Sequence, residues 1–254
     1  DFSVIAMGRF GGGELGFGSD ADVLYVYDAN GLDPQRAHEL ALQLVTGLRA
    51  YSEDHRVPFD LDADLRPEGR NGPLVRSIES YAEYYRRWSL SWEAQALLRA
   101  RGVAGSVKLI TRFMALADDV RYPAQVALQD LREIKRIKAR VENERLSQGV
   151  DRARHLKLGP GGLSDVEWLV QLLQHEHAHR IVGLQTTSTL TALEAAREAG
   201  LVPDAAAARL EASWRLASRL RSANTLLSGQ TSDVLPTDRG KLDGIGRLLE
   251  DPPR

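Results

Sequence analysis

The 254-residue sequence contains no cysteine. Disulfide bonds and thiolate zinc sites are therefore excluded, and the composition is compatible with the reducing cytoplasm, which is the compartment we expect. No apolar run is long enough to span a bilayer, and no signal-peptide pattern is present. With 33 Lys and Arg against 35 Asp and Glu, the net charge of −2 provides no field that would favour nucleic acid or an anionic membrane as a partner.

No element precedes the first strand pattern, which occupies residues 2–7. A strand at the very start of a sequence has nothing before it to cover its sheet, so we expect a fragment of a longer protein. The length suffices for one large domain or two modest ones.

Glycine is concentrated near the N-terminus, where it leads into a pair of acids. Between strand patterns at 2–7 and 23–27 lie Gly8, further glycines, and then Asp20 and Asp22. Alternate residues of a strand face the same side, which places the two carboxylates about 6–7 Å apart on one face. Such a pair repels unless a cation lies between its members, and Mg²⁺ suits it when phosphates complete the shell. Glycine backbone can approach a phosphate closely.

A second acidic pattern occupies residues 59–66, where apolar residues alternate with Asp60, Asp62 and Asp64. This period of two predicts a strand that is apolar on one face and acidic on the other. Solvent exposure is the ordinary interpretation of such a face. The alternative is a third carboxylate beside the Asp pair, which nucleotidyl transfer by two metals requires.

The rest of the chain is predicted to be mainly helical, almost wholly so from about Thr111. Trp88 and Trp92 are expected in the core, because large aromatic side chains dominate cores. Arg99 and Arg101 are either surface residues or ligands of phosphates or of an acidic partner. The segment 130–146 combines an apolar stripe with a basic face, which predicts a packed helix whose solvated side is basic.

Three histidines, His175, His177 and His179, do not indicate zinc. Only the first and last share a helical face, and no cysteine is available to complete a site. The tail from Ser228 is rich in Gly, Asp and Pro and is expected to be loosely ordered.

Four motifs in order along the chain resemble the glutamine synthetase adenylyltransferase/deadenylylase family of the nucleotidyltransferase superfamily. They are Ala6-Met7-Gly8-Arg9-Phe10-Gly11-Gly12 with Gly18-Ser19-Asp20-Ala21-Asp22, then Leu61-Asp62-Ala63-Asp64-Leu65-Arg66-Pro67, Trp92-Glu93-Ala94-Gln95-Ala96-Leu97, and Gly161-Gly162-Leu163-Ser164-Asp165-Val166-Glu167-Trp168. The wider superfamily has Ser or Gly after the turn glycine, whereas Arg9 stands here, as fits the narrower family. The Trp92 motif is more similar to the C-terminal, adenylylating half of the family than to the N-terminal half.

The resemblance implies an α+β fold. A small mixed-sheet nucleotidyltransferase domain is expected over residues 1–110 and an all-helical bundle over 111–254. The implied reaction moves AMP from ATP onto a tyrosine of glutamine synthetase and releases pyrophosphate, in control of nitrogen assimilation. The chain would be part of a longer two-headed enzyme, with a PII signal protein as a further candidate partner.

The resemblance also assigns roles residue by residue. Asp20, Asp22 and Asp62 are implied to be catalytic and to hold two Mg²⁺ ions. Asp62 matches the family's acid before Leu-Arg-Pro, whereas Asp60 and Asp64 do not. The residues implied to cradle the phosphates of ATP are Gly8, Arg9, Gly18 and Ser19. Those implied to line a cleft between the domains are Lys157, Asp165 and Glu167.

Two alternatives stay open. One is the same chemistry on another acceptor, by the deadenylylating half or by a related uridylyltransferase. The other is a non-catalytic regulatory module that keeps the fold and binds a PII-type partner.

Overall fold

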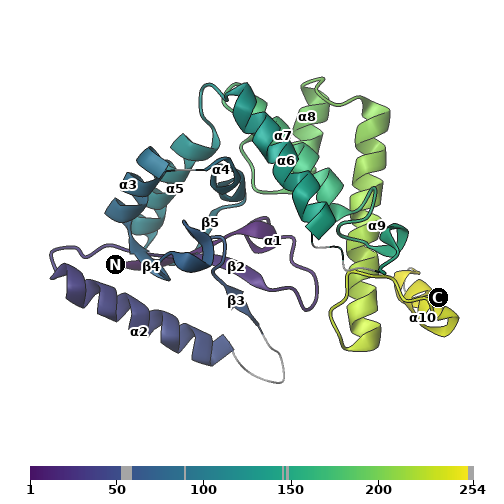
Figure 1. The fold of residues 1–254 in the computed structure, drawn as a ribbon, viewed down its shortest axis with the longest axis horizontal. Coiled ribbons are helices and arrows are strands. Elements are labelled where there is room, and N and C mark those ends of the chain that lie inside the picture. Colours follow the sequence, from purple (N-terminus) through teal and green to yellow (C-terminus); the bar gives the residue numbers. More distant parts are fainter. Residues whose placement is uncertain (53–58, 89, 145, 147–148, 251–254) are drawn as a thin grey trace. The chain divides into compact units, whose positions relative to one another are not determined.

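A computed structural model describes residues 1–52, 59–88, 90–144, 146 and 149–250. The chain forms two compact units. Unit 1 comprises Asp1–Leu15, Asp20–Ala127 and Gln174–Ser188, and unit 2 comprises Gly16–Ser19, Leu128–Leu173 and Thr189–Arg254. Figure 1 shows the sheet of the N-terminal part and the helices that follow it, so the predicted α+β class is confirmed. The division at residue 110 stays a prediction.

Unit 1 is built on a mixed sheet that has five strands in the described part of the chain. These are β1 (Phe2–Ala6), β2 (Ala21–Tyr27), β3 (Leu61–Asp62), β4 (Val75–Ser77) and β5 (Arg101–Gly105). β1 lies antiparallel between β2 and β5. β3 and β4 both pair in parallel with the other edge of β2, β3 at its start and β4 at its end. The predicted strands at 2–7 and 23–27 are confirmed as β1 and β2.

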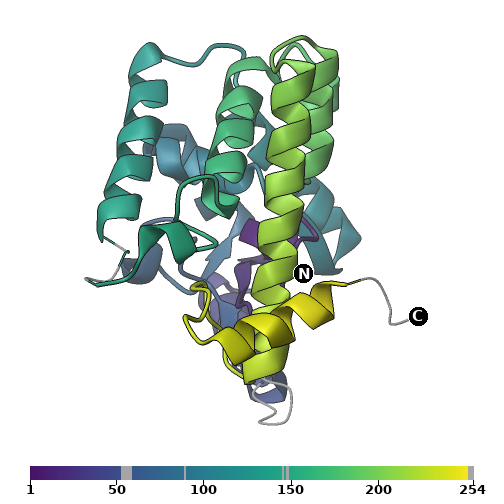
Figure 2. The ribbon, with the colours of Figure 1, turned by 90° about the vertical axis from the view of Figure 1, so that its right-hand side faces the viewer.

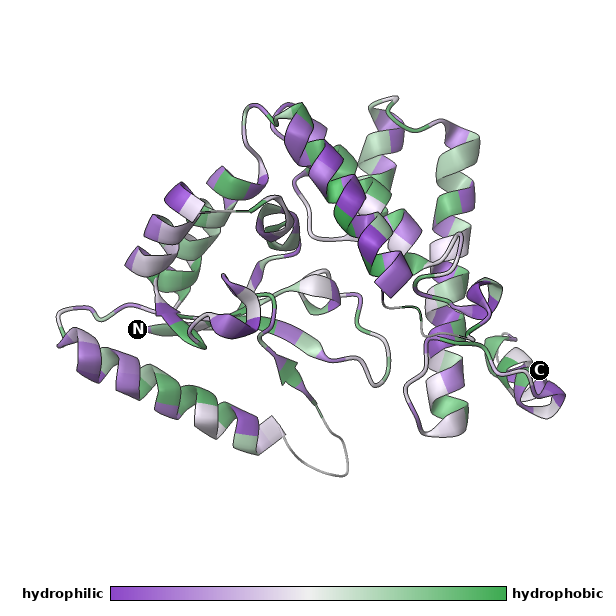
Figure 3. Cartoon of the chain, viewed as in Figure 1, coloured by the Kyte–Doolittle hydropathy of each residue, from purple (hydrophilic) through white to green (hydrophobic). Residues whose placement is uncertain are grey.

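Alternation along β2 separates two cores. Leu24 and Val26 pack with α3 (Ile78–Trp88), α4 (Ser91–Leu97) and α5 (Val107–Arg121). Val23 and Tyr25 pack with α2 (Pro34–Ser52) on the other face. A strand that is buried on both faces reads as a continuous apolar run, which is what residues 23–27 show. Figure 3 shows hydrophobic and hydrophilic residues alternating along α2, as expected for a helix with one face on a sheet.

Short helical elements occur in both units. α1 (Gly8–Gly11) is a single turn of helix after β1. Three 3-10 turns lie at Gly69–Asn71, Arg152–Arg154 and Val182–Leu184. The sequence did not indicate β4 or β5, because each is short and neither shows a clear alternation of apolar and polar residues.

The predicted strand over 59–66 is wrong in length. Only Leu61 and Asp62 pair in β3, and residues 53–58 lie outside the described part of the chain. Asp62 Oδ1 accepts a hydrogen bond of 2.7 Å from the backbone N–H of Asp64, and the N–H of Arg66 donates to the carbonyl of Ala63. This turn stabilised by an Asp side chain ends the strand, so Asp60, Asp62 and Asp64 do not share a strand face.

The expected burial of Trp88 is also wrong. Trp88 is the last residue of α3 and is 67% exposed, because it lies beyond the tyrosines through which that helix meets the core. Trp92, in α4, is half-buried.

Unit 2 is helical, as predicted for this part of the chain. Its helices are α6 (Leu128–Glu144), α8 (Thr189–Glu198), α9 (Asp204–Ser228) and α10 (Arg239–Leu249), together with α7 (Leu163–His177) as far as Leu173. α6 buries Ile134 of the predicted apolar stripe and exposes most of its basic residues, which Figure 3 shows as its hydrophilic surface. No helix in the described ranges has the length and apolar character needed to cross a bilayer.

The expectation of a loosely ordered tail is wrong for the described residues up to 250. α10 begins at Arg239 and is capped by Asp238, whose side chain accepts a hydrogen bond from the N–H of Lys241. It packs across the end of α9, where Gly244 leaves room for Leu227 (Figure 2). The loop before it is held by Asn224, whose amide donates to the carbonyls of Ser232 and Val234.

Buried tyrosines of α3 make the core of unit 1 sensitive to alkali. Burial raises the pKa of Tyr81 and Tyr85 well above the ordinary value. Burial raises the pKa of Tyr84 to about 12, helped by the Glu93 carboxylate, which accepts a hydrogen bond of 2.8 Å from the Tyr84 hydroxyl. Between pH 10 and 12 the folded protein therefore keeps protons that the unfolded chain releases.

The free energy of unfolding should accordingly be undiminished by these groups below about pH 10 and should fall as the pH rises towards 12. Each retained proton steepens the loss by up to about 1.4 kcal/mol per pH unit. Urea denaturation from pH 8 to 11 measures this slope. Tyr84→Phe should flatten it, because the variant lacks the group whose pKa is raised. Equal slopes in the parent and Tyr84→Phe would contradict the assignment.

Candidate active site

The turn after β1 lies directly against Asp22, the second acid of the Asp20/Asp22 pair. The N–H of Met7 donates to the carbonyl of Asp22 at 2.8 Å. Gly8 follows with a φ of +49°, and a Cβ at this position would lie 2.1 Å from Oδ2 of Asp22. Only glycine fits here, because both the backbone conformation and the space exclude a side chain.

Parallel pairing brings two of the three predicted acids together. Asp22 and Asp62 are register partners in the ladder of β2 and β3. Neighbouring strands lie about 4.8 Å apart, and paired residues face the same side, so the two half-buried carboxylates are neighbours. Asp20 lies just before the strand and is exposed. The site therefore consists of a close pair with a third acid two residues away in the chain.

The two other acids of this segment have different surroundings. Asp60 is exposed, and its carbonyl accepts a hydrogen bond of 2.8 Å from the N–H of Ala21, which aligns β3 on β2. Asp64 forms an ion pair with Arg70 at 2.5 Å and lies 3.7 Å from Arg66. Asp64 is thus engaged with arginines of its own turn, whereas Asp62 is in register with Asp22.

Three arginines hold the glycine turn. Arg101 donates to the carbonyl of Gly11 at 2.9 Å and to that of Phe10 at 3.1 Å. Arg99 forms an ion pair with Glu14 at 3.1 Å, in which the two side chains are only 5% and 8% exposed, and it also donates to the carbonyl of Thr187. Arg9 donates through Nε to the carbonyl of Glu14 at 2.9 Å.

The sequence alone leaves Arg99 and Arg101 as either surface residues or ligands of phosphates or of an acidic partner. The structure shows that both hold the backbone or a carboxylate of unit 1. Arg101 is the first residue of β5 and Arg99 precedes that strand, and the sequence gives no signal for this function because the pairing of β5 with β1 is not predicted from it.

The predicted phosphate-binding residues Gly18 and Ser19 belong to unit 2. Gly18 has a φ of +69°, and its carbonyl accepts a hydrogen bond of 3.0 Å from the hydroxyl of Thr231. The hydroxyl of Ser19 accepts a hydrogen bond of 2.8 Å from Nη1 of Arg221. No motif in the sequence indicated that residues 221 and 231 contact this loop.

Two of the three residues expected to line a cleft, Asp165 and Glu167, have side-chain partners inside unit 2. Oδ1 of Asp165 forms an ion pair with Lys138 at 2.6 Å, and Oδ2 accepts a hydrogen bond of 2.8 Å from the N–H of Gly161. Glu167 accepts a hydrogen bond of 3.4 Å from the indole of Trp214. The cleft-lining role of Lys157, Asp165 and Glu167 stays a prediction.

The donor chemistry of the acidic pair suits a hard divalent ion. Aspartate oxygens are the ligands that Mg²⁺ prefers, and phosphate oxygens commonly complete its shell. Among the residues that the structure describes, no three His, Cys, Asp or Glu side chains converge into a complete metal-binding group, His175 and His179 included. Asp22 and Asp62 are thus two neighbouring oxygen donors, and their function as metal ligands stays a prediction.

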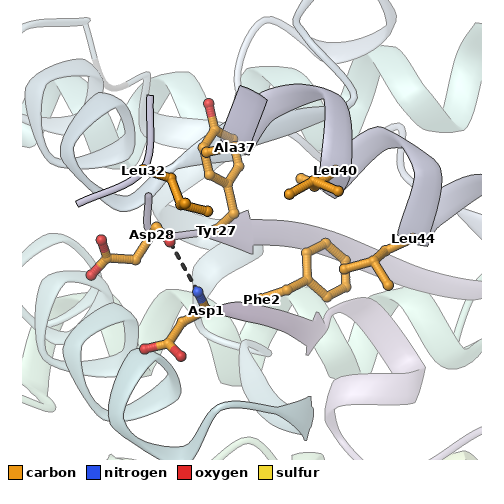
Figure 4. Close-up of a pocket in the computed structure, with 9 residues that line it drawn as sticks. Asp1, Phe2, Tyr27, Asp28, Leu32, Ala37, Leu40 and Leu44 are labelled. Atoms are coloured by element: carbon orange, nitrogen blue, oxygen red, sulfur yellow. Dashed lines mark hydrogen bonds between the residues drawn. The ribbon is translucent and has the colours of Figure 1, made fainter. Parts of the chain in front are cut away.

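A separate pocket of about 260 Å³ lies where β1 starts and β2 ends, away from the Gly8 turn (Figure 4). It is lined by the side chains of Phe2, Tyr27 and Leu44 and by neighbours in α2, and the amino group of Asp1 donates to the carbonyl of Asp28 at 3.0 Å. Its walls are mostly apolar, and it contains none of the predicted site residues. It is not the place where the acids meet.

Gly8→Ala should destabilise the fold more than a positive φ alone explains. Gly13→Ala is the matched control, because Gly13 has a φ of +68° and nothing within 4 Å of its Cβ position. We expect the control to cost about 1–2 kcal/mol and Gly8→Ala at least about 1 kcal/mol more, since Asp22 must move. Urea denaturation measures both. In an Asp22→Ala background the extra cost should shrink, and equal costs for the two glycines in the parent would refute the contact.

Comparisons with known proteins divide the chain in two. The family model described as Glutamate-ammonia ligase adenylyltransferase matches residues 1–116, which contain all three predicted acids. The family model described as GlnD PII-uridylyltransferase matches residues 133–250.

Relatives match the chain over nearly its whole length. A protein of Leifsonia xyli named bifunctional glutamine synthetase adenylyltransferase/adenylyl-removing enzyme is 60% identical over 253 residues, which are 100% of this chain and 25% of that protein. Proteins of the same name from Streptomyces coelicolor and Mycobacterium avium are 53% and 50% identical over 98% and 96% of this chain, again 25% of each protein. The chain thus spans about a quarter of the length of these relatives. On this similarity, and on the order of its motifs, the chain belongs to the glutamine synthetase adenylyltransferase/adenylyl-removing enzyme family.

Proposed function

We propose that this chain is an adenylyltransferase that moves AMP from ATP onto a tyrosine hydroxyl of glutamine synthetase. The observation that carries the proposal is the register of Asp22 and Asp62 beside the Gly8 turn. Two carboxylates on adjacent strands, next to backbone that excludes side chains, suit a nucleotide whose phosphates approach the turn. The family name supplies the acceptor protein.

In the reaction the phenolic oxygen of tyrosine bonds to the α-phosphorus of ATP, and the bond from that phosphorus to the bridging oxygen of pyrophosphate breaks. The phenol must lose its proton, and its ordinary pKa of about 10 makes it a poor nucleophile without help. Asp62 is the proposed acceptor of that proton, because it lies next to Asp22. Its Oδ1 already accepts a hydrogen bond from the N–H of Asp64, so the proton would go to Oδ2.

Asp20, Asp22 and Asp62 would hold the two Mg²⁺ ions. When bound, these ions neutralise phosphate charge and stabilise the attacking and leaving oxygens of an in-line displacement. Without a cation, the neighbouring carboxylates repel one another, which favours binding of an ion with its nucleotide.

The phosphates of ATP would be cradled by Gly8, Arg9, Gly18 and Ser19. Gly8 offers backbone without a side chain, and Ser19 offers a hydroxyl proton. Nε of Arg9 already donates a hydrogen bond to the carbonyl of Glu14. Any contact with a phosphate would therefore come from the end of its guanidinium group.

The adenylylating half is favoured over the deadenylylating half by the motif at Trp92-Glu93. Glu93 is 2% exposed and accepts hydrogen bonds from Tyr84 and from the N–H of Leu90, so this motif organises the core beside the sheet. The proposed setting is a longer two-headed enzyme of the cytoplasm, where ATP is available. A PII signal protein is a proposed further partner of that enzyme.

The match of residues 133–250 to a uridylyltransferase family supports a second candidate function. In that case the same acids would transfer UMP from UTP. The first candidate is preferred because the acids themselves lie in the part matched by the adenylyltransferase family.

Incubation of the full chain with glutamine synthetase and ATP labelled at the α-phosphate should place label on the synthetase, because the proposed reaction forms a tyrosyl–AMP bond. UTP labelled in the same way should give none. An Asp22→Ala variant is the control for contaminating enzymes. If label is transferred from UTP but not from ATP, the uridylyltransferase alternative holds and the proposal is overturned. If the chain transfers no AMP but removes AMP from adenylylated synthetase when phosphate is present, the deadenylylating alternative holds.

Asp62→Asn should lower turnover by about 10²-fold or more, the usual scale for losing general-base assistance. It should leave stability nearly unchanged, because an asparagine oxygen can still accept the N–H of Asp64. Asp64→Asn is the matched control, since it weakens the ion pairs of Asp64 with the 83% exposed Arg70 and with Arg66 at 3.7 Å, and it should cost about 1 kcal/mol of stability. Single-turnover transfer of AMP measures both, and comparable losses of rate would reassign the third carboxylate.

A further inference from the structure

The loop immediately before the Asp pair is held by residues more than 200 positions later in the sequence. Gly16–Ser19 belongs to unit 2, although the residues on either side belong to unit 1. Nη1 of Arg221 donates to the hydroxyl of Ser19 at 2.8 Å, and the hydroxyl of Thr231 donates to the carbonyl of Gly18 at 3.0 Å. The last two residues of this loop are thus each hydrogen-bonded to another segment of unit 2.

The fit around this loop is close. A Cβ at Gly18 would lie 2.4 Å from the hydroxyl oxygen of Thr231, and one at Gly16 would lie 3.5 Å from the hydroxyl oxygen of Ser222 and 3.7 Å from Nη1 of Arg221. The loop consequently rests on α9 and on the segment after it with little space to spare.

Arg221 is itself held in place. It lies in α9, is 7% exposed, and donates through Nε to the carboxylate of Asp233. Asp233 is fixed by its carbonyl, which accepts a hydrogen bond of 2.7 Å from the N–H of Leu156. Asn224, one turn of α9 further on, donates to the carbonyls on both sides of Asp233. A buried guanidinium with this support has a defined direction.

We propose that Arg221 is a positioning residue for nucleotide binding, which orients the Ser19 hydroxyl and, through it, the loop that leads into Asp20. The inference rests on the proposed function, in which Ser19 contacts a phosphate of ATP. Because the oxygen of Ser19 accepts a hydrogen bond from Arg221, its own proton is directed to another acceptor, such as a phosphate oxygen. Arg221 acts through Ser19 and is not assigned a contact with the nucleotide.

The arrangement requires arginine and not merely a cation. Two different nitrogens of the planar guanidinium serve two partners, Nε for Asp233 and Nη1 for Ser19. Lysine has a single nitrogen on a flexible stem and cannot reproduce this fork. Arg221→Lys therefore keeps the charge for Asp233 and weakens the hold on Ser19.

The experiment compares Arg221→Lys, Ser19→Ala and the double variant in the full chain. Arg215→Lys is the matched control, because Arg215 is on the same helix but is 59% exposed and paired with Glu211. The measurements are hydrogen exchange of the amides of residues 16–20, KM and kcat for ATP in AMP transfer, and Tm.

We expect Arg221→Lys to speed exchange of the loop amides about tenfold and to raise KM for ATP about tenfold, the scale of one hydrogen bond to a charged group. kcat should change less than KM, and Tm should stay within about 4 °C of the parent. The double variant should be no worse than Ser19→Ala alone, since both changes break one interaction. If Arg221→Lys does not fold, Ser19→Ala must still speed loop exchange.

Exchange and KM equal to those of the Arg215→Lys control would overturn the inference. So would effects of Arg221→Lys and Ser19→Ala that multiply in the double variant, because Arg221 would then act independently of Ser19. If the parent neither binds ATP nor transfers AMP, the proposed function fails. In that case faster loop exchange in Arg221→Lys still shows the hold on the loop, whereas unchanged exchange overturns it.

Discussion

The close approach of the Asp22 carboxylate to the Cα of Gly8 is the contact on which the site depends. It exists because β1 and β2 pair antiparallel up to Ala6 and Val23, and because the turn then places a glycine with a positive φ beside the next acid. A side chain at residue 8 would separate the turn from the strand. With the turn against Asp22, the pairing of β3 on the other edge of β2 brings Asp62 to the same place.

A loop rich in glycine is costly to order, since glycine loses more conformational freedom on folding than any other residue. In this protein, arginines offset that cost. Arg101 and Arg99 fix the first part of the loop within unit 1, and Arg221 fixes its last residue within unit 2. The ion pair of Arg99 with Glu14 is buried, so removing either partner would leave an uncompensated charge and cost about 3–5 kcal/mol. Each part of the loop is therefore held by side chains of its own unit.

Asp60, Asp62 and Asp64 show how a local turn gives similar residues different surroundings. All three are aspartates at alternate positions, and the pattern alone treats them alike. In the structure Asp60 contributes backbone to the pairing of β3, Asp62 faces Asp22, and Asp64 is bound by arginines of the following turn. The difference arises because the Asp62 side chain caps its own turn and ends the strand after two residues.

Much of the architecture was readable from sequence, because it depends on local patterns. The apolar runs at 2–7 and 23–27 predicted β1 and β2, the spacing of apolar residues predicted the helices, and the motif with Asp62 singled out one acid that then lay in register with Asp22. The length of β3, the strands β4 and β5, the exposure of Trp88 and the ordered α10 required tertiary structure, since short strands and terminal helices are stabilised by their neighbours and not by their own pattern. The hydrogen bonds from Arg101 to Gly11 and from Arg221 to Ser19 could not be predicted from sequence either. Sequence specifies which residue carries a charge, but a partner 90 or 202 positions away is decided only when the chain folds.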